Sequence, residues 1–181
     1  KILGFLKYPG LYMSLWHRKL EDYPNIAISQ EDIYDQIDWT EMFGNENPIH
    51  VEIGSGKGTF VVNQARAFPE INFIGIEWAR KYFRYAVDRV GRWGLANVRM
   101  IRTDALDFVN KFIPEGSVEC FHVYFPDPWP KKAHNKRRFI QERNLPVLLK
   151  CLKAGGVIQF VTDHEDYFEQ ASLALHEQVG E

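Results

Sequence analysis

From residue 49 onward, the chain alternates short β-rich runs with amphipathic segments of helical length. Five runs rich in β-branched and aromatic residues are expected to be strands: residues 49–53, 72–76, 98–102, 118–125 and 157–162. Strands joined through helices lie parallel, because each crossover is right-handed and packs back onto a face of the sheet. The alternation therefore predicts an α/β fold with a Rossmann-like, doubly wound and mostly parallel sheet.

The helical segments differ in how clearly their ends are marked. Residues 79–92 have the strongest helical period, with an apolar stripe of Ala79, Tyr82, Phe83, Ala86, Val87 and Val90. The helix before the last strand is expected to begin near Pro146 and to stop at Gly155-Gly156. A final helix is expected over residues 164–179. Residues 1–48 are less regular, and we interpret them as an N-terminal extension of a domain that spans residues 49–181.

Composition excludes several classes of protein. Hydrophobic residues make up 45% of the 181 residues and charged residues 25%, as in soluble globular domains. No apolar run is long enough to span a membrane, and no secretory leader is visible. Cys120 and Cys151 are far apart in apolar surroundings, and no metal-binding spacing of Cys or His occurs. We expect a cytoplasmic domain without metal or membrane, and its oligomeric state, monomer or homodimer, stays open.

Charge is distributed unevenly along the chain. The net charge is −5 over residues 1–56, +9 over residues 57–153 and −6 over residues 154–181. A basic middle between acidic ends indicates an anionic partner only if the basic side chains converge on one site. Otherwise, such charges belong to solvated surfaces.

A glycine-rich turn, Gly54-Ser55-Gly56-Lys57-Gly58, follows the first strand of the domain. A phosphate-binding P-loop needs glycine where Val51 stands and Ser or Thr where Gly58 stands, so that reading fails. A dinucleotide fingerprint needs glycine at position 59, which is Thr. The remaining readings are a tight turn without ligand and the G-x-G-x-G loop of S-adenosylmethionine-dependent methyltransferases, in which Gly54 and Gly56 would face the cofactor.

Three acidic residues lie near this turn in the predicted sheet. Glu77 ends the second strand, where a carboxylate can accept hydrogen bonds from ribose hydroxyls. Asp104 ends the third strand, where S-adenosylmethionine-dependent methyltransferases hold the adenine amino group, and it could instead or also cap the next helix. Glu52 lies inside the first strand, and a buried carboxylate there needs a partner such as a cationic cofactor group. Together, they favour S-adenosylmethionine over a nicotinamide cofactor.

The segment Phe125-Pro126-Asp127-Pro128-Trp129 ends the fourth strand and precedes a basic run, Lys131–Arg138. Prolines at alternate positions predict a stiff, extended loop beside the reactive methyl group. Trp129 can stack on a base, whereas Phe125 is more simply explained by core packing. Five Lys or Arg residues within eight positions form a plausible track for phosphates, although charge runs are more often solvated surfaces.

In these motifs the chain resembles the bacterial tRNA (guanine-N7-)-methyltransferases of the TrmB type, which have the class I methyltransferase fold. The resemblance covers roughly residues 46–170 and rests on six short motifs: Val51-Glu52-Ile53-Gly54, Gly75-Ile76-Glu77, Asp104-Ala105, 125–129, 134–138 and Thr162-Asp163. It implies methyl transfer from S-adenosyl-L-methionine to a variable-loop guanosine of tRNA.

The resemblance also implies roles for single residues. Glu52, Gly54, Gly56, Glu77 and Asp104 would hold the cofactor, and Asp127 would be the catalytic acid that also contacts it. Lys131 and Asp163 would bind the substrate, and we expect Lys136, Arg137 and Arg138 to contact tRNA phosphates. Members of the family continue with two further strands and a Thr-x-aromatic-Glu motif that helps to hold the guanine, so we expect this sequence to be incomplete at its C-terminus.

Two alternatives stay open. Methyltransferases that act on exocyclic amines carry a D/N-P-P-aromatic loop at the same place, whereas the order here is Pro-Asp-Pro-Trp. A non-catalytic RNA-binding module could also retain this fold. Binding of S-adenosylmethionine separates the module from an enzyme.

Overall fold

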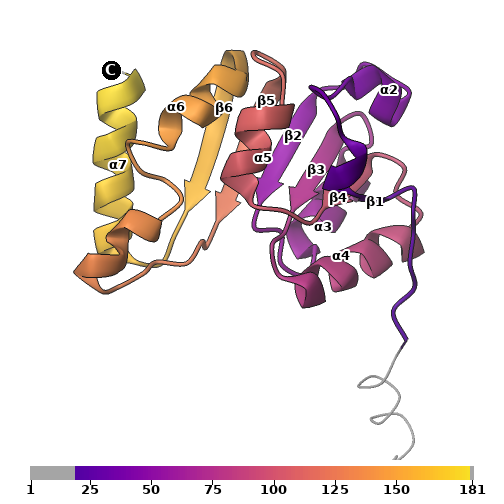
Figure 1. The fold of residues 1–181 in the computed structure, drawn as a ribbon, viewed down its shortest axis with the longest axis horizontal. Coiled ribbons are helices and arrows are strands. Elements are labelled where there is room, and N and C mark those ends of the chain that lie inside the picture. The colour runs from indigo at the N-terminus through magenta and orange to yellow at the C-terminus, as the bar shows by residue number, and fades with distance from the viewer. Residues whose placement is uncertain (1–18, 180–181) are drawn as a thin grey trace, which may run out of the picture.

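The computed structural model describes residues 19–179. In this part of the chain, six strands form one parallel sheet in the order β1-β4-β3-β2-β5-β6 (Figure 1). The strands are β1 (Ala27–Ile28), β2 (Ile49–Ile53), β3 (Asn72–Ile76), β4 (Val98–Ile101), β5 (Val118–Tyr124) and β6 (Leu152–Val161). The expected doubly wound parallel α/β sheet is therefore confirmed.

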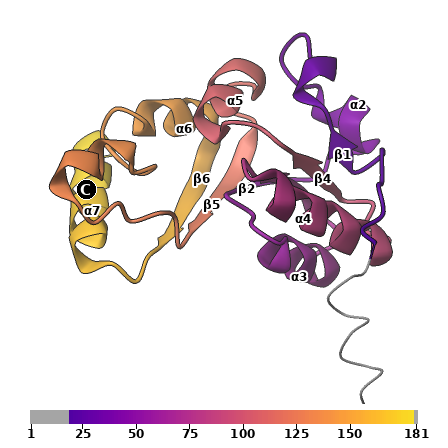
Figure 2. The same ribbon diagram turned by 60° about the horizontal axis from the view of Figure 1, so that its bottom comes forward.

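Helices cover both faces of the sheet. α3 (Thr59–Ala67) and α4 (Arg80–Arg92) lie on one side, and α5 (Ala105–Phe112) and α6 (Leu145–Cys151) lie on the other (Figure 2). α7 (Glu165–Val179) packs beside α6 at the β6 edge. The remaining elements are α2 (Trp39–Phe43) and two 3-10 turns, η1 (Gln30–Asp32) and η2 (Lys132–Arg137). No helix in residues 19–179 is long and apolar enough to cross a membrane.

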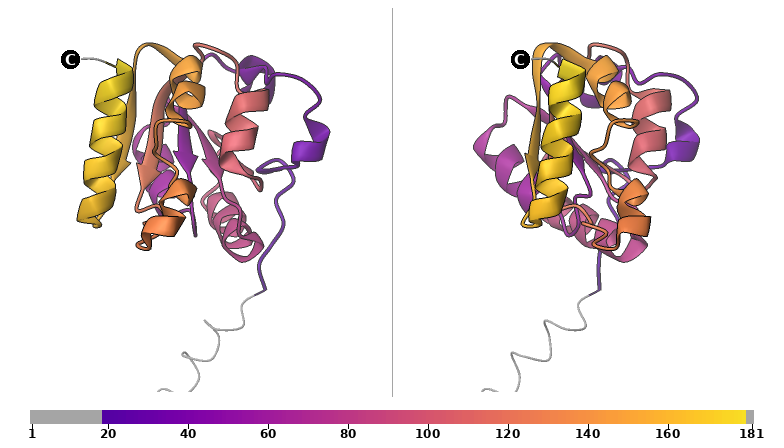
Figure 3. Two further views of the ribbon diagram at one scale, coloured as in Figure 1. Left: turned by 60° about the vertical axis from the view of Figure 1, so that its left-hand side comes forward. Right: turned by 90° about the vertical axis from the view of Figure 1, so that its left-hand side faces the viewer.

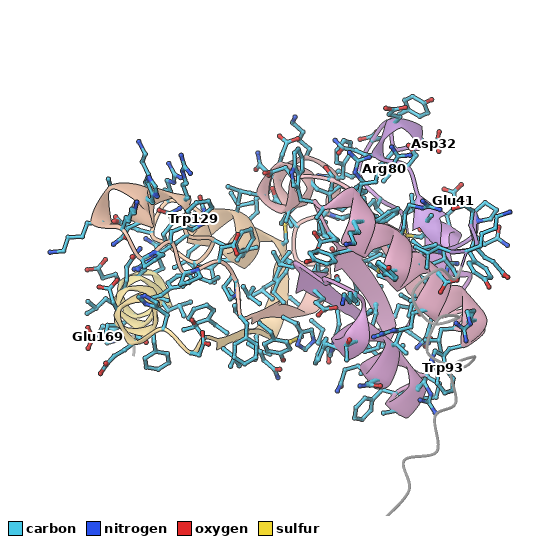
Figure 4. The ribbon with its side chains drawn as sticks, turned by 90° about the horizontal axis from the view of Figure 1, so that it is seen from below. Asp32, Glu41, Arg80, Trp93, Trp129 and Glu169 are labelled. Atoms are coloured by element: carbon cyan, nitrogen blue, oxygen red, sulfur yellow. The ribbon has the colours of Figure 1, made fainter. Side chains whose placement is uncertain are left out.

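The central strands form the core because they are apolar on both faces. Every residue of β3 is buried, as expected of a strand covered by helices on both sides. The buried side chains gather in two clusters, one that includes residues of α5, α6 and α7 and one that includes residues of α3 and α4. Parallel pairing brings the carboxyl ends of β2, β3, β4 and β5 to the same edge, which Figure 4 shows from below.

Two boundaries differ from those expected. β1 pairs with β4 through Ala27↔Met100 and Ile28↔Ile101, so the sheet begins inside the segment that we interpreted as an extension. The helix before β6 ends at Cys151 rather than at Gly155-Gly156, and β6 accordingly begins at Leu152 rather than at residue 157. The chain has to turn there, because the pairing with β5 passes from Val118↔Leu152 to Cys120↔Val157 through an irregularity. Gly155, with φ of 79°, lies in that turn.

Candidate active site

A cavity of about 790 Å³ opens at the carboxyl ends of the central strands. Its wall is built from the turns that follow β2, β3, β4 and β5 and from part of the segment before α6. Six of the predicted site residues line it: Gly54, Gly56, Glu77, Asp104, Asp127 and Arg137. The other five, Glu52, Lys131, Lys136, Arg138 and Asp163, lie outside the lining, and their placement is described below.

The glycine turn leaves open space in front of its backbone. Gly54 and Gly56 have φ of 74° and 54°, a region that other residues rarely adopt, and a Cβ on either would meet no atom within 4 Å. The N–H groups of Gly54 and Ser55 donate to the carbonyl of Ile76, at 2.9 and 3.0 Å. The turn is therefore fixed to β3 from behind while its front faces the cavity.

Glu77 braces this turn with its carboxylate. Oε2 accepts a hydrogen bond from the N–H of Gly56 at 2.8 Å, and Oε1 accepts one from the N–H of Ala79 at 2.7 Å. Each carboxylate oxygen has a second lone pair, so both can still accept from a ligand hydroxyl. Glu77 thus links the glycine turn to the start of α4 and offers acceptor oxygens on the cavity wall.

Of the two roles that the sequence left open for Asp104, the structure shows the helix cap and leaves the ligand contact a prediction. Its Oδ1 accepts from the N–H of Asp107 at 2.9 Å, which makes it the N-cap of α5. The residue is exposed and lines the cavity. Capping fixes the orientation of the side chain and leaves part of its carboxylate available to a ligand.

Glu52 is buried behind the glycine turn and lacks a full set of partners. Only 5% of the residue is exposed, and its Oε2 has no hydrogen-bond partner among the described residues. Burial raises the pKa of this carboxyl to about 7, while a hydrogen bond from Ser55 opposes the shift. An unsatisfied buried carboxylate fits a cationic group bound beside it, such as the amino group of S-adenosylmethionine.

The loop after β5 is held in an unusual conformation. Phe125 and Trp129 have φ of 48° and 45°, and each such non-glycine residue costs roughly 1–2 kcal/mol. Between them, Asp127 is exposed on the cavity wall, and no donor within residues 19–179 reaches its carboxylate. Phe125 is 66% exposed, so the expected core packing of this side chain is wrong. The inverted backbone turns its ring outward.

The basic run forms the 3-10 turn η2 and has two kinds of side chain. Lys131, Lys136 and Arg137 are exposed, and the Arg137 guanidinium lies 4.8 Å from the centre of the Trp129 ring. Arg138 is 0% exposed and donates all its hydrogen bonds inside the protein. It has no surface to offer a tRNA phosphate, which corrects its assignment to that contact set. Burial of the guanidinium depends on partners in α7 that the sequence pattern does not reveal.

Asp163 is exposed between β6 and α7, outside the cavity wall. The neighbouring Thr162 supplies the local cap, since its hydroxyl accepts from the N–H of His164 at 3.2 Å. No described hydrogen bond occupies the Asp163 carboxylate. The side chain is thus available to a partner that approaches the carboxyl edge from the β6 side.

Some cavity residues were missed by sequence reasoning. Trp78 and Tyr82 line the wall after β3, and Arg143 and Asn144 line it before α6. Trp78 directly follows Glu77 and is 71% exposed. An aromatic residue next to an acid that was expected to hold the cofactor is the sequence feature that could have identified it. Tyr82 was assigned to the apolar stripe of α4, but it is 43% exposed at the cavity. Arg143 and Asn144 carried no comparable signal.

A polar chain runs from the cavity into the sheet. Tyr124 lines the cavity. Its hydroxyl donates to Gln159 Oε1 at 2.5 Å and lies 2.9 Å from His122 Nδ1, and His122 Nε2 is 3.0 Å from His50 Nδ1. His122 therefore donates from Nδ1 and accepts at Nε2, and burial lowers its pKa to about 4. His50, Cys120 and His122 also bring potential metal-ligand atoms within 4.8 Å of one another. Within this cluster, the two histidine rings are hydrogen-bonded and Cys120 Sγ lies 3.8 Å from His122 Nδ1.

Comparison with known proteins identifies the family. Residues 46–179 match a family described as putative methyltransferase. A tRNA (guanine-N(7)-)-methyltransferase of Rhodopirellula baltica is 40% identical over 166 residues, 89% of this chain and 58% of that protein. One of Listeria monocytogenes is 39% identical over 160 residues, 88% of this chain and 73% of that protein. The chain belongs to this methyltransferase family. It spans about 58% to 73% of the length of these two relatives.

Solved structures agree on the fold. A precorrin-6y C5,15-methyltransferase of Geobacter metallireducens has a TM-score of 0.58 and 16% identity, and the match covers 87% of this chain and 83% of that one. An S-adenosylmethionine-dependent O-methyltransferase of Thermotoga maritima has a TM-score of 0.56 and 18% identity, and the match covers 81% of this chain and 53% of that one. These similarities establish the methyltransferase fold and say nothing about substrate.

Proposed function

We propose that this protein is a cytoplasmic enzyme that transfers the methyl group of S-adenosyl-L-methionine to N7 of a variable-loop guanine in tRNA. The observation that carries the proposal is the composition of the cavity. The glycine turn, Glu77 and Asp104 line one part of its wall, and Asp127, Trp129 and Arg137 line another. One cavity thus combines features of a cofactor site with features of a nucleic-acid site. The names of the curated relatives support the substrate.

The residues present fit the cofactor. Glu77 offers acceptors for ribose hydroxyls and Asp104 one for an amino group, and Gly54 and Gly56 leave room for close approach. The unsatisfied Oε2 of Glu52 fits a cationic group. When bound, S-adenosylmethionine supplies an electrophilic methyl group.

Guanine N7 carries a free lone pair, so its attack on a methyl group needs no general base. The protein has to orient the base and offset the positive charge that develops on it. A carboxylate such as Asp127 at about 4 Å can contribute up to roughly 4 kcal/mol at an effective dielectric constant near 20. Asp127 can also orient the guanine by accepting hydrogen bonds from its N1–H and its amino group. Trp129 and the exposed Phe125 are available for stacking on the base.

We further propose that Lys131, Lys136 and Asp163 contact the tRNA outside the cavity and that Arg137 contacts it from the cavity wall. The exposed cations beside the cavity mouth would bind phosphates, and Asp163 would bind at the β6 side. The fully buried Arg138 is not included.

The test is incubation of the protein with methyl-labelled cofactor and unmodified tRNA, followed by mapping of labelled nucleosides. We expect label in 7-methylguanosine at a single variable-loop position. Label only on adenosine, or only on protein, would overturn the guanine assignment in favour of exocyclic-amine transfer. Calorimetry provides the second measurement, because tRNA binding without any binding of S-adenosylmethionine would support the non-catalytic module.

A further inference from the structure

Arg138 is the largest fully buried side chain in residues 19–179, and it connects three segments of the chain. Nε donates to the carbonyl of Pro128 at 2.8 Å. One terminal nitrogen donates to Gln170 Oε1 at 2.6 Å, and the other pairs with Asp166 Oδ2 at 2.5 Å. The guanidinium lies 4.9 Å from the centre of the Tyr167 ring. Burying a guanidinium without partners is very costly in free energy. The loss of any one of these contacts should therefore destabilise the arrangement.

The contact with Pro128 acts directly on the proposed catalytic loop. The Pro128 carbonyl belongs to the peptide unit that leads into Trp129, whose φ is 45°. Fixing the plane of that peptide holds Trp129 in its unfavourable conformation, and Asp127 is the residue immediately before Pro128. At the other end of the loop, the N–H of Phe125 donates to the carbonyl of Val161 at 2.8 Å. The loop is therefore tied to β6 at one end and to α7 at the other.

The contacts with α7 couple two parts of the proposed tRNA-binding surface, the Asp127 loop and the segment that carries Asp163. Asp127 lies on the loop after β5, and Asp163 lies just before α7, beside the first turn that contains Asp166. Figure 3 shows α7 alongside the segment that carries η2 and Arg138. The Asp166 pKa is lowered chiefly by the hydrogen bond from Arg138, as expected of a carboxylate that stays ionised in this pair. Tyr167 adds a further tie, because its hydroxyl accepts from the N–H of Ile140 at 2.8 Å.

We infer that Arg138 is a positioning residue for methyl transfer, which locks the Asp127 loop and the start of α7 into one frame by hydrogen bonds to Pro128, Asp166 and Gln170. This inference rests on the proposed function, because it assigns the frame to the guanine-binding half of that site. The guanidinium itself touches neither cofactor nor substrate. A lysine at this position keeps the charge but lacks the planar fork, so it cannot hold the three acceptors in their present geometry.

The test compares Arg138→Lys with Arg66→Lys, a matched control that makes the same change. Arg66 stacks on Trp93 at 3.6 Å near the end of α3, away from the cavity. For Arg138→Lys we expect kcat for tRNA methylation to fall about 10- to 100-fold, as misplaced reacting groups do. The Kd for S-adenosylmethionine should stay within about threefold, since its proposed ligands lie elsewhere. Arg66→Lys should change neither quantity.

Limited trypsin digestion supplies a readout that does not need activity. Lys131 and Lys132 are exposed in the loop, so cleavage after them reports its opening. We expect Arg138→Lys to accelerate this cleavage about tenfold while cleavage elsewhere keeps its rate. Asp166→Ala and Gln170→Ala remove one acceptor each, and they test the same link should Arg138→Lys fold poorly. Combined with Arg138→Lys, either change should add little, because both act on one network.

Unchanged kcat and unchanged loop cleavage in Arg138→Lys would overturn the inference. Equal acceleration of cleavage at all sites, with parallel losses of cofactor affinity and kcat, would also overturn it, because Arg138 would then only stabilise the fold. Failure of the proposed function is a separate result. In that case the unsubstituted protein transfers no methyl group to guanosine, although loop cleavage still responds selectively to Arg138→Lys.

Discussion

At the scale of single residues, burial strongly shifts the pKa of the Glu52 carboxyl. Burial raises its pKa from 4.5 to about 7, so the native state binds a proton that the unfolded chain releases. This contribution to stability is complete below pH 4.5 and is lost as the pH rises through about 7. A cationic cofactor group would prefer the ionised form, so binding and proton release should be linked.

We therefore predict that S-adenosylmethionine binds more tightly as the pH rises towards 7, by up to about tenfold per pH unit. Calorimetry at pH 6 in two buffers of different ionisation enthalpy should detect a proton released on binding. Glu52→Gln should bind more weakly and release no proton. Affinity that is independent of pH in the unsubstituted protein would show that Glu52 does not face the cationic group.

At Asp127, two substitutions separate charge from hydrogen bonding. Asp127→Ala should abolish detectable turnover, because it removes both. Asp127→Asn keeps one acceptor oxygen and loses the charge. If charge stabilisation dominates, the asparagine variant should lose up to about a thousandfold in kcat, the equivalent of roughly 4 kcal/mol. If orientation of the base dominates, its loss should be closer to tenfold and should fall mainly on KM for tRNA.

Single-turnover assays with saturating cofactor provide the measurement for this pair. Activity of Asp127→Ala equal to that of the unsubstituted protein would remove Asp127 from the mechanism. The family resemblance also implies that Asp127 contacts the cofactor. The cofactor Kd of each variant shows whether a loss of activity comes from that contact.

At the scale of elements, the start of α3 depends on a close approach to α4. Gly58 is the N-cap of α3 with φ of 71°, and a Cβ there would lie 2.9 Å from Cβ of Ala86 in α4. Gly94 has a similar φ of 62°, but a Cβ there would meet nothing within 4 Å. The two glycines share a backbone conformation and differ in the space around them.

Gly58→Ala should therefore destabilise the protein by roughly 2–4 kcal/mol, from backbone strain together with overpacking. Gly94→Ala should cost about 1–2 kcal/mol, from strain alone. Urea unfolding of both variants gives the comparison. Equal losses of stability in the two variants would mean that α3 and α4 can move apart without cost. The contact between Gly58 and Ala86 would then not be what fixes the glycine turn.

On the scale of the whole molecule, the excess of positive charge lies in residues 57–153, which include the basic run beside the cavity. Lys136→Ala and Arg137→Ala should raise KM for tRNA and leave the cofactor Kd unchanged. Each lost phosphate contact should reduce the slope of log affinity against log salt by about 0.7 to 0.9. Tryptophan fluorescence or filter binding across a salt series measures this slope. The distant Arg66→Ala is the control, and an unchanged slope in both variants would place the basic run outside the tRNA interface.

Much of the fold was predictable because it follows from local patterns. Strands β2 and β3 lie at the residues expected from their composition, and α4 and α7 begin within one residue of the predicted positions. Their apolar runs are long enough to decide the class of element and the parallel arrangement. The ends of the strands then located the residues of the cavity, since parallel strands present their carboxyl ends at one edge. Gly54, Gly56, Glu77, Asp104 and Asp127 follow from that rule.

The tertiary structure decided whether neighbouring residues with the same local sequence pattern are exposed or buried. Arg137 and Arg138 are adjacent and chemically identical, yet the first lies exposed on Trp129 and the second is buried against α7. The partners of Arg138 include residues 28 and 32 positions away, beyond the reach of any local pattern. Likewise, the outward turn of Phe125 and the pairing of β1 with β4 depend on long-range contacts. The sequence by itself determined five of the six strands, the cavity edge and the chemical groups there, because local periodicity encodes them. Which charges remain available to a partner was decided only when distant elements packed together.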